Sequence, residues 1–311
     1  MEFAHRSVMP QEVVEYLRCV PGGVYVDGTL GGGGHAARIL EASAPDGRVI
    51  GIDRDQDALS AAREFLKPYG ARAVLVKSDY RDLLVVLDGL GIKEIDGIVL
   101  DLGVSSFQLE SGERGFSFAR DARLDMRMDR TQGLTAYDIV NGQSVEELAR
   151  ILREYGEERD ARRIARAIDR QRKIRPVATT LQLAAIVEAA VPRRFQPRSI
   201  HPATRVFQAL RIAVNDELEG LAQGLEAGLR ALRSGGRFVV ISFHSLEDRI
   251  VKRSFRDFST GCVCPPRIPK CVCGHEPGAR LLTRRAVKPS EQETGSNPRS
   301  RSARLRAVEK L

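Results

Sequence analysis

The sequence predicts an α/β fold, a doubly wound parallel sheet with helices on both faces, interrupted by an all-helical insertion. Short apolar runs rich in β-branched residues alternate with helical patterns over the first hundred residues, as expected of parallel strands that are buried on both faces. Strand patterns are then absent from about residue 108 to residue 215 and return at residues 236–244. The 311 residues suffice for one large α/β domain with an insertion.

The first predicted strand, residues 24–27, ends in Asp27 and precedes four consecutive glycines, Gly31 to Gly34. Glycine tolerates positive φ and lets the backbone approach a ligand, and a helix over residues 36–42 would point its first N–H groups at polar ligand atoms. The loose pattern G-x-G-x-x-A beginning at Gly31 is weak evidence by itself. With its flanking strand and helix, the stretch favours a nucleotide-cofactor site over an ordinary flexible turn.

An acid closes or follows each of the next three predicted strands as well. The strands are residues 48–53, 73–77 and 95–100, and the acids are Asp53, Asp79 and Asp101. Asp53 lies about twenty residues past the glycines, where a ribose hydroxyl needs an acceptor, although a lone acid there could also cap a helix. Together the acids suit S-adenosylmethionine, which has a ribose, an adenine amine and a cationic amino-acid end that carboxylates neutralise.

Charge is unevenly distributed along the chain. Residues 1–149 carry 16 Lys and Arg against 24 Asp and Glu, whereas residues 150–212 carry 15 against 6. In the basic part, five arginines recur at helical spacing: Arg159, Arg162, Arg163, Arg166 and Arg170. Guanidinium groups match phosphates and stack on bases, so a polyanion such as RNA is the expected partner. The alternative is that these arginines pair with acids of the preceding turns.

No apolar run approaches the roughly 20 residues of a membrane helix, and the first residues lack the plan of a secretory signal. We therefore expect a cytoplasmic protein without a membrane partner.

The remaining elements complete a sheet of about seven strands. We expect insertion helices over residues 145–155, 159–172 and 180–190, a long helix over 204–232, and late strands within 280–287 and 303–308. The predicted domains are residues 1–107 and 216–311, which together form the α/β part, and residues 108–215, which form the helical insertion.

A further helix should begin after the fifth strand, where Ser245 and Asp248 fit the S-x-x-D/E capping signature. Capping does not account for the basic residues on either side of this signature, nor for the basic residues at positions 201, 205 and 211. We expect these to contact RNA rather than to form salt bridges between domains. They are His201, Arg205, Arg211, His244 and Arg249.

Four of the five cysteines lie close together in the sequence, at Cys262, Cys264, Cys271 and Cys273. Their spacing suits tetrahedral binding of zinc by thiolates, and a disulfide framework is not expected in a reducing cytoplasm. A structural zinc ion is thus one open interpretation, with no role in the chemistry. Cys19 is expected to be a small core residue.

Seven motifs, in order along nearly the whole chain, resemble the RsmH (MraW) family. They are HRSVM at 5–9, DGTLGGGGH at 27–35, DLGVSSFQL at 101–109, ERGFSF at 113–118, LDMRMD at 124–129, HPATRVFQALRI at 201–212 and SFHSLEDR at 242–249. The resemblance implies a class I S-adenosylmethionine-dependent methyltransferase fold with a helical insertion. It also implies methyl transfer to the exocyclic N4 of a cytosine in the decoding region of 16S ribosomal RNA, with this rRNA or the small ribosomal subunit as partner.

The family pattern implies a set of cofactor contacts. They are Gly33, Gly34 and His35 at the methionine end, Asp53 on the ribose, Tyr80 beside the adenine, and Asp101 and Gln108. Many amino-methyltransferases have D/N/S-P-P-aromatic after the fourth strand, whereas this chain has DLGVSSF at 101–107. The departure leaves the catalytic hydrogen-bond acceptor open. Asp101 is the main candidate, Ser105 and backbone carbonyls are lesser ones, and Phe107 is either a stacking ring or part of the core.

Two other classes share part of these patterns. A nicotinamide-dependent oxidoreductase would share the glycine turn and Asp53, but it would need a longer pyrophosphate cradle and no arginine-rich insertion. A zinc-bearing RNA-binding protein without catalysis would leave the strand-end acids unexplained. The sequence leaves open the oligomeric state and whether free rRNA or an assembled subunit is the substrate.

Overall fold

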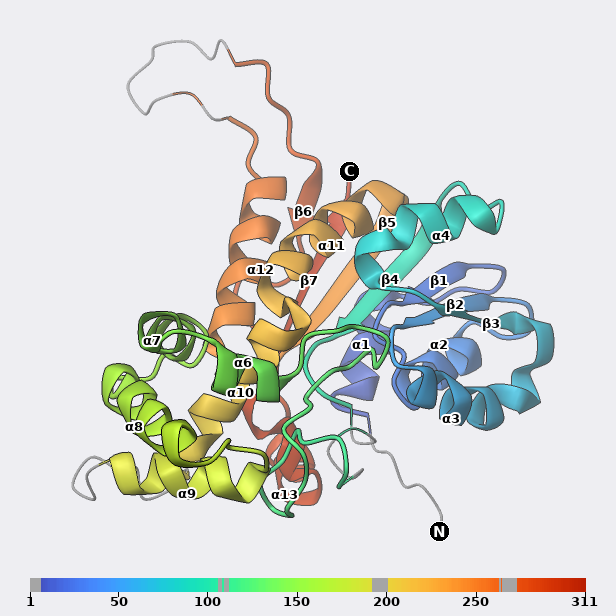
Figure 1. Cartoon of the computed structure of the whole chain (residues 1–311). Helices are drawn as coiled ribbons and strands as arrows, with labels where there is room; N and C mark the ends of the chain where they lie inside the picture. Colours follow the sequence, from blue (N-terminus) through green and yellow to red (C-terminus); the bar gives the residue numbers. More distant parts are fainter. Residues whose placement is uncertain (1–6, 106–107, 109–111, 192–200, 263, 265–272) are drawn as a thin grey trace. The chain divides into compact units, whose positions relative to one another are not determined.

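The computed structural model describes residues 7–105, 108, 112–191, 201–262, 264 and 273–311 (Figure 1). The chain forms two compact units, Met1–Gly103 with Leu218–Leu311 and Val104–Glu217. We call the first the sheet unit and the second the helical unit. The glycine turn and the strand-end acids belong to the sheet unit, and the arginine-rich stretch belongs to the helical unit.

The sheet unit contains a seven-stranded sheet in the order β3-β2-β1-β4-β5-β7-β6. The strands are β1 (Val24–Asp27), β2 (Arg48–Asp53), β3 (Ala73–Lys77), β4 (Ile95–Asp101), β5 (Leu232–Ser242), β6 (Ala279–Leu281) and β7 (Arg304–Lys310). The first five pair in parallel, whereas β7 is antiparallel to both β5 and β6. The predicted α/β fold is confirmed. The strand expected within 280–287 is shorter, since β6 ends at Leu281 and Val287 forms only an isolated bridge with Leu305.

Alternate residues of the central strands enter two cores, one on each face of the sheet. Val99 and Val239 belong to one core, whereas their neighbours Ile98 and Phe238 belong to the other. Because side chains alternate along a strand, a sheet covered on both faces needs continuous apolar runs. Helices α1 (Pro10–Leu17), α2 (Gly34–Ala42) and α3 (Gln56–Leu66) contribute to the first core, and α4 (Leu83–Gly89), α11 (Glu217–Ala231) and α12 (Ser245–Phe258) contribute to the second.

The helical unit has a core of its own. Its described helices are α6 (Ala136–Gly142), α7 (Val145–Glu154), α8 (Ala161–Ile174), α9 (Thr180–Ala190) and α10 (Ala203–Asn215). Thr135 and Thr179 begin α6 and α9 with capping boxes. In the part of this unit that the structure describes there is no strand, only an isolated bridge between Arg123 and Thr179. None of the described helices of either unit is long and apolar enough to cross a membrane.

The single helix predicted over residues 204–232 is wrong. The chain forms α10 and α11 instead, because Asp216 between them has a left-handed backbone with φ of 50°. The Asn215 side chain holds this break: its oxygen accepts from the Met128 N–H at 2.7 Å, and its amide donates to the Met126 carbonyl at 2.8 Å. Apolar periodicity continues on both sides of the break, so the sequence pattern does not reveal it.

Candidate active site

The glycine turn after β1 requires glycine at two positions. Gly31 and Gly33 have φ of 51° and 85°, values that side chains disfavour. A Cβ on Gly33 would also lie 3.1 Å from Leu66 of α3. No side chain caps α2, which starts at Gly34, two residues before the predicted start. The turn therefore places backbone without side chains, and the N–H groups at the start of a helix, at the carboxyl end of β1. Such N–H groups can bind the polar atoms of a ligand.

Asp53, at the end of β2, fixes this turn. Its Oδ2 accepts from the Gly31 N–H and its Oδ1 from the Asp55 N–H, each at 2.8 Å. It is not a helix cap, because Asp55 occupies the cap position of α3 and accepts from the Asp57 N–H. A carboxylate has about four acceptor positions. Asp53 thus has the capacity to bind ribose hydroxyls while it holds the turn.

Three titratable side chains gather beside the turn. Asp27 ends β1, Asp101 ends β4, and His35 lies in the first turn of α2, with its Nε2 3.3 Å from the Asp101 Oδ2. That distance is within ion-pair range, but neither ring nitrogen makes a hydrogen bond to a described residue. Asp27 Oδ2 and Asp101 Oδ1 are also buried without a hydrogen-bond partner among the described residues. Buried polar atoms without partners are rare in folded proteins, so these atoms are candidates to bind a ligand or an ordered water.

Burial and mutual charge shift the titration of these groups. Burial raises the pKa of Asp27 to about 6, against the lowering effect of His35. Burial also raises the pKa of Asp53 to about 6. For His35, burial works to lower the pKa, but the Asp101 and Asp27 carboxylates outweigh it and the net shift is upward. At neutral pH the buried site therefore carries carboxylate charge that favours a cationic ligand.

Tyr80 follows β3 and lies half-buried at the start of a short 3₁₀ segment, Tyr80–Asp82. Its ring lies against the backbone of α11, since a Cβ on Gly224 would come within 2.6 Å of the ring carbon Cε2. On the preceding turn of α11, a Cβ on Gly220 would lie 2.9 Å from the Arg81 side chain. Sequence reasoning missed this helix surface. The signal was available as glycines at 220, 224 and 228, spaced by four residues.

Asp79 differs from the other strand-end acids. It accepts from the Arg81 N–H and forms ion pairs with Arg81 at 3.0 Å and with Arg54 at 3.5 Å. Its charge is therefore already balanced by two arginines. The structure brings Asp27, Asp53 and Asp101 close enough around the turn for their charges to interact. Asp79 instead forms ion pairs with two arginines.

Gln108 belongs to the helical unit, so its expected contact with a cofactor stays a prediction. In that unit it pairs with Ser105: the Gln108 Oε1 accepts from the Ser105 N–H at 3.0 Å, and the Ser105 hydroxyl accepts from the Gln108 N–H at 3.2 Å. This reciprocal pair gives Ser105 a structural role. Phe107 lies outside the described residues.

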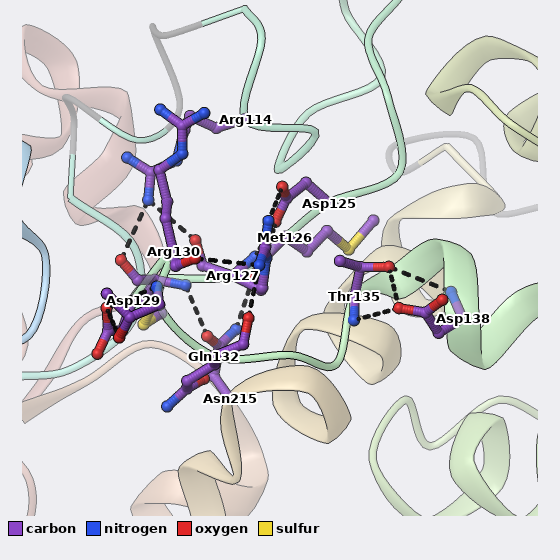
Figure 2. A network of polar contacts seen from close by, with 12 residues as sticks. Arg114, Asp125, Met126, Arg127, Asp129, Arg130, Gln132, Thr135, Asp138 and Asn215 are labelled. Carbon is purple, nitrogen blue, oxygen red and sulfur yellow. Dashed lines mark hydrogen bonds and ion pairs between the residues drawn. The ribbon is translucent and has the colours of Figure 1, made fainter.

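The motif at residues 124–129 forms a loop of the helical unit that side-chain hydrogen bonds hold in place (Figure 2). Arg127 binds the Asp125 carboxylate through hydrogen bonds of 2.7 and 2.8 Å. Arg114 donates to the Arg127 carbonyl at 2.9 Å. Met126 has a positive φ of 61°, and the Asn215 amide described above holds its carbonyl. These contacts explain the motif as a rigid loop fixed to the end of α10.

The arginines of α8 lie on its exposed side. Arg162, Arg163, Arg166 and Arg170 are exposed, whereas the opposite side of the helix is buried, with Ala161, Ile164, Ala165 and Ile168. Among the described residues none of these four forms an ion pair, while the acid Glu154 pairs with Arg150 at 2.6 Å. The alternative interpretation is that these arginines pair with acids of the preceding turns. Among the described residues, these four side chains do not form such pairs.

Other basic residues have structural contacts within the helical unit. Arg211 binds Glu217 through two hydrogen bonds of 2.9 Å. The His201 Nδ1 accepts from the Ala203 N–H at 3.1 Å where α10 begins, and Arg205 donates weakly to the Glu157 carbonyl at 3.5 Å.

The predicted cap of α12 is wrong. His244 is the cap, and Glu247 completes the box by accepting from the His244 N–H at 3.2 Å. Asp248 instead binds Arg306 at 2.7 Å and Arg304 at 3.0 Å, both on β7. Burial would raise the pKa of Asp248, but these arginines outweigh it and the pKa is lowered. The cap lies one residue earlier than predicted, because a histidine occupies the cap position where serine or threonine is usual.

A sheet of this order, in which only β7 runs opposite to the other strands, is that of the class I S-adenosylmethionine-dependent methyltransferases. The model of the MraW methylase family matches residues 2–311, so the chain belongs to that family. The oxidoreductase and the non-catalytic RNA-binding protein are thereby excluded as its class.

The chain is similar to proteins named ribosomal RNA small subunit methyltransferase H. That of Geotalea daltonii is 58% identical over 310 residues, covering 100% of this chain and 99% of that protein. That of Geobacter sulfurreducens is 58% identical over 311 residues, covering 100% of both. Among solved structures, an rRNA methylase from Streptococcus thermophilus is similar over 97% of this chain and 93% of that chain, with a TM-score of 0.42 and 12% identity.

Proposed function

We propose that this protein transfers a methyl group from S-adenosylmethionine to the exocyclic N4 of a cytosine in the decoding region of small-subunit rRNA. The observation that carries the proposal is a group of buried atoms on Asp27, His35 and Asp101, beside the glycine turn, that make no hydrogen bond to a described residue. A cationic amino-acid end fits this group because the carboxylates gain a partner that the described residues do not supply. The names of the relatives support small-subunit rRNA as the substrate.

Each part of the site has a role in holding the methyl donor. The backbone of Gly33 and Gly34 and the His35 side chain would lie at its methionine end, and Asp53 would accept from its ribose hydroxyls. Tyr80 would flank the adenine, with its ring held against Gly224. We retain Gln108 as a further contact from the helical unit. When bound, the cofactor supplies a methyl group on a positively charged sulfur.

The protein's part in the chemistry is positioning and hydrogen bonding. The lone pair of a cytosine N4 is delocalised into the ring, so an acceptor that binds its N–H makes the nitrogen a better nucleophile. We assign this acceptor to Asp101, whose Oδ1 is without a partner among the described residues while its Oδ2 lies 3.3 Å from His35. His35, which lies within ion-pair distance of this carboxylate, acts as a positioning residue through its charge.

The exposed arginines of α8 are suited to contact rRNA phosphates. Four side chains on one helix side carry charge without an ion-pair partner among the described residues, and such charge supplies affinity that falls with salt.

The proposal is tested with purified protein and S-adenosylmethionine carrying a labelled methyl group. Small subunits, protein-free small-subunit rRNA and large subunits are offered separately, and the digested nucleosides are analysed by mass spectrometry. We expect N4-methylcytidine from one or both small-subunit substrates and none from large subunits. Label on carbon 5 of cytosine, or only on large-subunit RNA, would contradict the proposal. Asp101→Asn should lower kcat, because the amide is a weaker acceptor for the N4–H, and should raise KM for the cofactor, because the site loses one carboxylate charge.

A further inference from the structure

The cysteines near the end of the chain bring three sulfur atoms together. The Sγ atoms of Cys262, Cys264 and Cys273 all lie within 4.8 Å of one another, and those of Cys262 and Cys273 are 3.8 Å apart. Cys271, the remaining cysteine of the cluster, lies outside the described residues. The three described thiols come from two chain segments, one after α12 and one before β6, whose described parts run out from the sheet unit in Figure 1.

The distances fit a metal site and do not fit a disulfide. Two bonded cysteine sulfurs would lie about 2.05 Å apart. Sulfurs that each lie about 2.3 Å from a zinc ion, at the corners of a tetrahedron, are about 3.8 Å from one another. The Cys262 and Cys273 sulfurs have this separation, and the Cys264 sulfur lies within 4.8 Å of both.

Burial of apolar side chains does not account for the convergence. Cys262, Gly274, His275 and Glu276 are exposed, and the nearby described residues are at most half-buried. At the base of the two segments the backbone is fixed, since the Gly278 N–H donates to the Phe258 carbonyl at 2.9 Å. Beyond this point the described residues of the two segments approach each other at the thiols and where the His275 Nδ1 lies 3.4 Å from the Gly261 carbonyl oxygen.

We propose that Cys262, Cys264 and Cys273 bind one zinc ion as thiolates. Soft sulfur ligands select zinc among the common hard and borderline divalent ions. Binding releases the thiol protons, so the site holds metal more weakly at acidic pH. The ion joins the segment after α12 to the segment before β6 and stabilises them where the described residues form no apolar core. It lies in a different part of the sequence from the glycine turn and the strand-end carboxylates, and it serves the fold of this segment.

Cys19 offers a matched control within the same chain. It is the fifth cysteine, and burial raises the pKa of its thiol to about 12, so it stays protonated and is unsuited to bind metal. Cys19→Ser removes one sulfur, as Cys262→Ser and Cys273→Ser do, without touching the cluster.

The test measures metal in the full-length protein purified without chelators. We expect about one equivalent of zinc in the unaltered protein and in Cys19→Ser, and a loss of most of it in Cys262→Ser and Cys273→Ser. Metal-free protein given Co²⁺ alone should show thiolate-to-cobalt charge-transfer absorption, which the cluster variants lack. Limited proteolysis between residues 259 and 278 should become faster when the metal is removed.

Three results would overturn the proposal. The first is less than about a tenth of an equivalent of metal together with no cobalt absorption. The second is bound iron in place of zinc. The third is zinc that remains in both cluster variants. The cobalt spectrum reports on the ligands directly, so it decides the matter even where a variant folds poorly and loses activity.

Discussion

Burial of the Asp27 carboxylate carries a cost in stability that His35 and the Thr29 N–H offset only in part. Its pKa of about 6 in the folded protein exceeds the value of about 3.9 expected in the unfolded chain. The folded state therefore binds more protons between these values. The resulting contribution favours folding below about pH 4 and is lost as the pH rises through about 6.

We predict that Asp27→Asn raises the free energy of unfolding of the cofactor-free protein at pH 8 by about 1–3 kcal/mol. The amide keeps the size of the carboxyl and removes the buried charge. Near pH 4 the gain should disappear, because Asp27 is then protonated. The same variant should bind S-adenosylmethionine more weakly. Urea unfolding at both pH values and calorimetry measure the two effects, and equal stability at pH 8 would contradict the assignment.

Asp53 tests the ribose contact. We predict that Asp53→Ala weakens S-adenosylmethionine binding by roughly 1–3 kcal/mol, because a charged acceptor is lost from the ribose hydroxyls. Asp88→Ala is the control, since Asp88 is an exposed acid of α4. Titration calorimetry measures both variants. Unchanged affinity in Asp53→Ala would remove this residue from the site.

At the scale of the element, α11 positions Tyr80. A Cβ on Gly224 would overlap the ring, so Gly224→Ala should displace Tyr80 and lower the affinity for S-adenosylmethionine. The helix itself should tolerate alanine, which has a higher helix propensity than glycine. Gly89→Ala is the control, because a Cβ there meets nothing within 4 Å. If affinity in Gly224→Ala equals that of the control, Tyr80 does not flank the cofactor.

Helix α8 gives the second prediction at this scale. Replacing Arg162, Arg163 and Arg166 together with glutamine should raise the dissociation constant for small-subunit rRNA and flatten its dependence on salt. The matched control removes three charges from the sheet unit, at Arg38, Arg63 and Lys67; Arg38 and Lys67 already pair with glutamates. Binding measured over a salt series separates the two. An identical salt slope for both triple variants would show that the α8 arginines serve the fold alone.

For the whole molecule, features that depend on residues close together in the sequence could be predicted, and features that depend on residues far apart in the sequence could not. The strands at 48–53 and 73–77 and the helix at 180–190 have the predicted bounds, because apolar runs and adjacent turn or capping residues define them locally. The break at Asp216 was missed because Asn215 depends on residues 87 and 89 positions away. The pairing of Asp248 with β7 likewise spans more than 50 residues.

The site was predictable to the same degree. The glycine turn and the acids at strand ends follow from one rule, that parallel strands present their carboxyl ends at one edge. The rule does not say which acid is already neutralised, and Asp79 proved to be paired with Arg54 and Arg81. Nor does it reveal that His35 and Asp101 approach to 3.3 Å or that Gly224 supports Tyr80.

The central claim, methylation of cytosine N4 in small-subunit rRNA, is tested most directly by mass spectrometry of rRNA from cells that lack this protein. Fragments of the decoding region are compared with those from cells carrying the intact chain and from cells carrying Asp53→Ala. We predict that an N4-methyl group on one cytidine is absent without the protein, restored by the intact chain and reduced with Asp53→Ala. Persistence of that methyl group in cells lacking the protein would contradict the account.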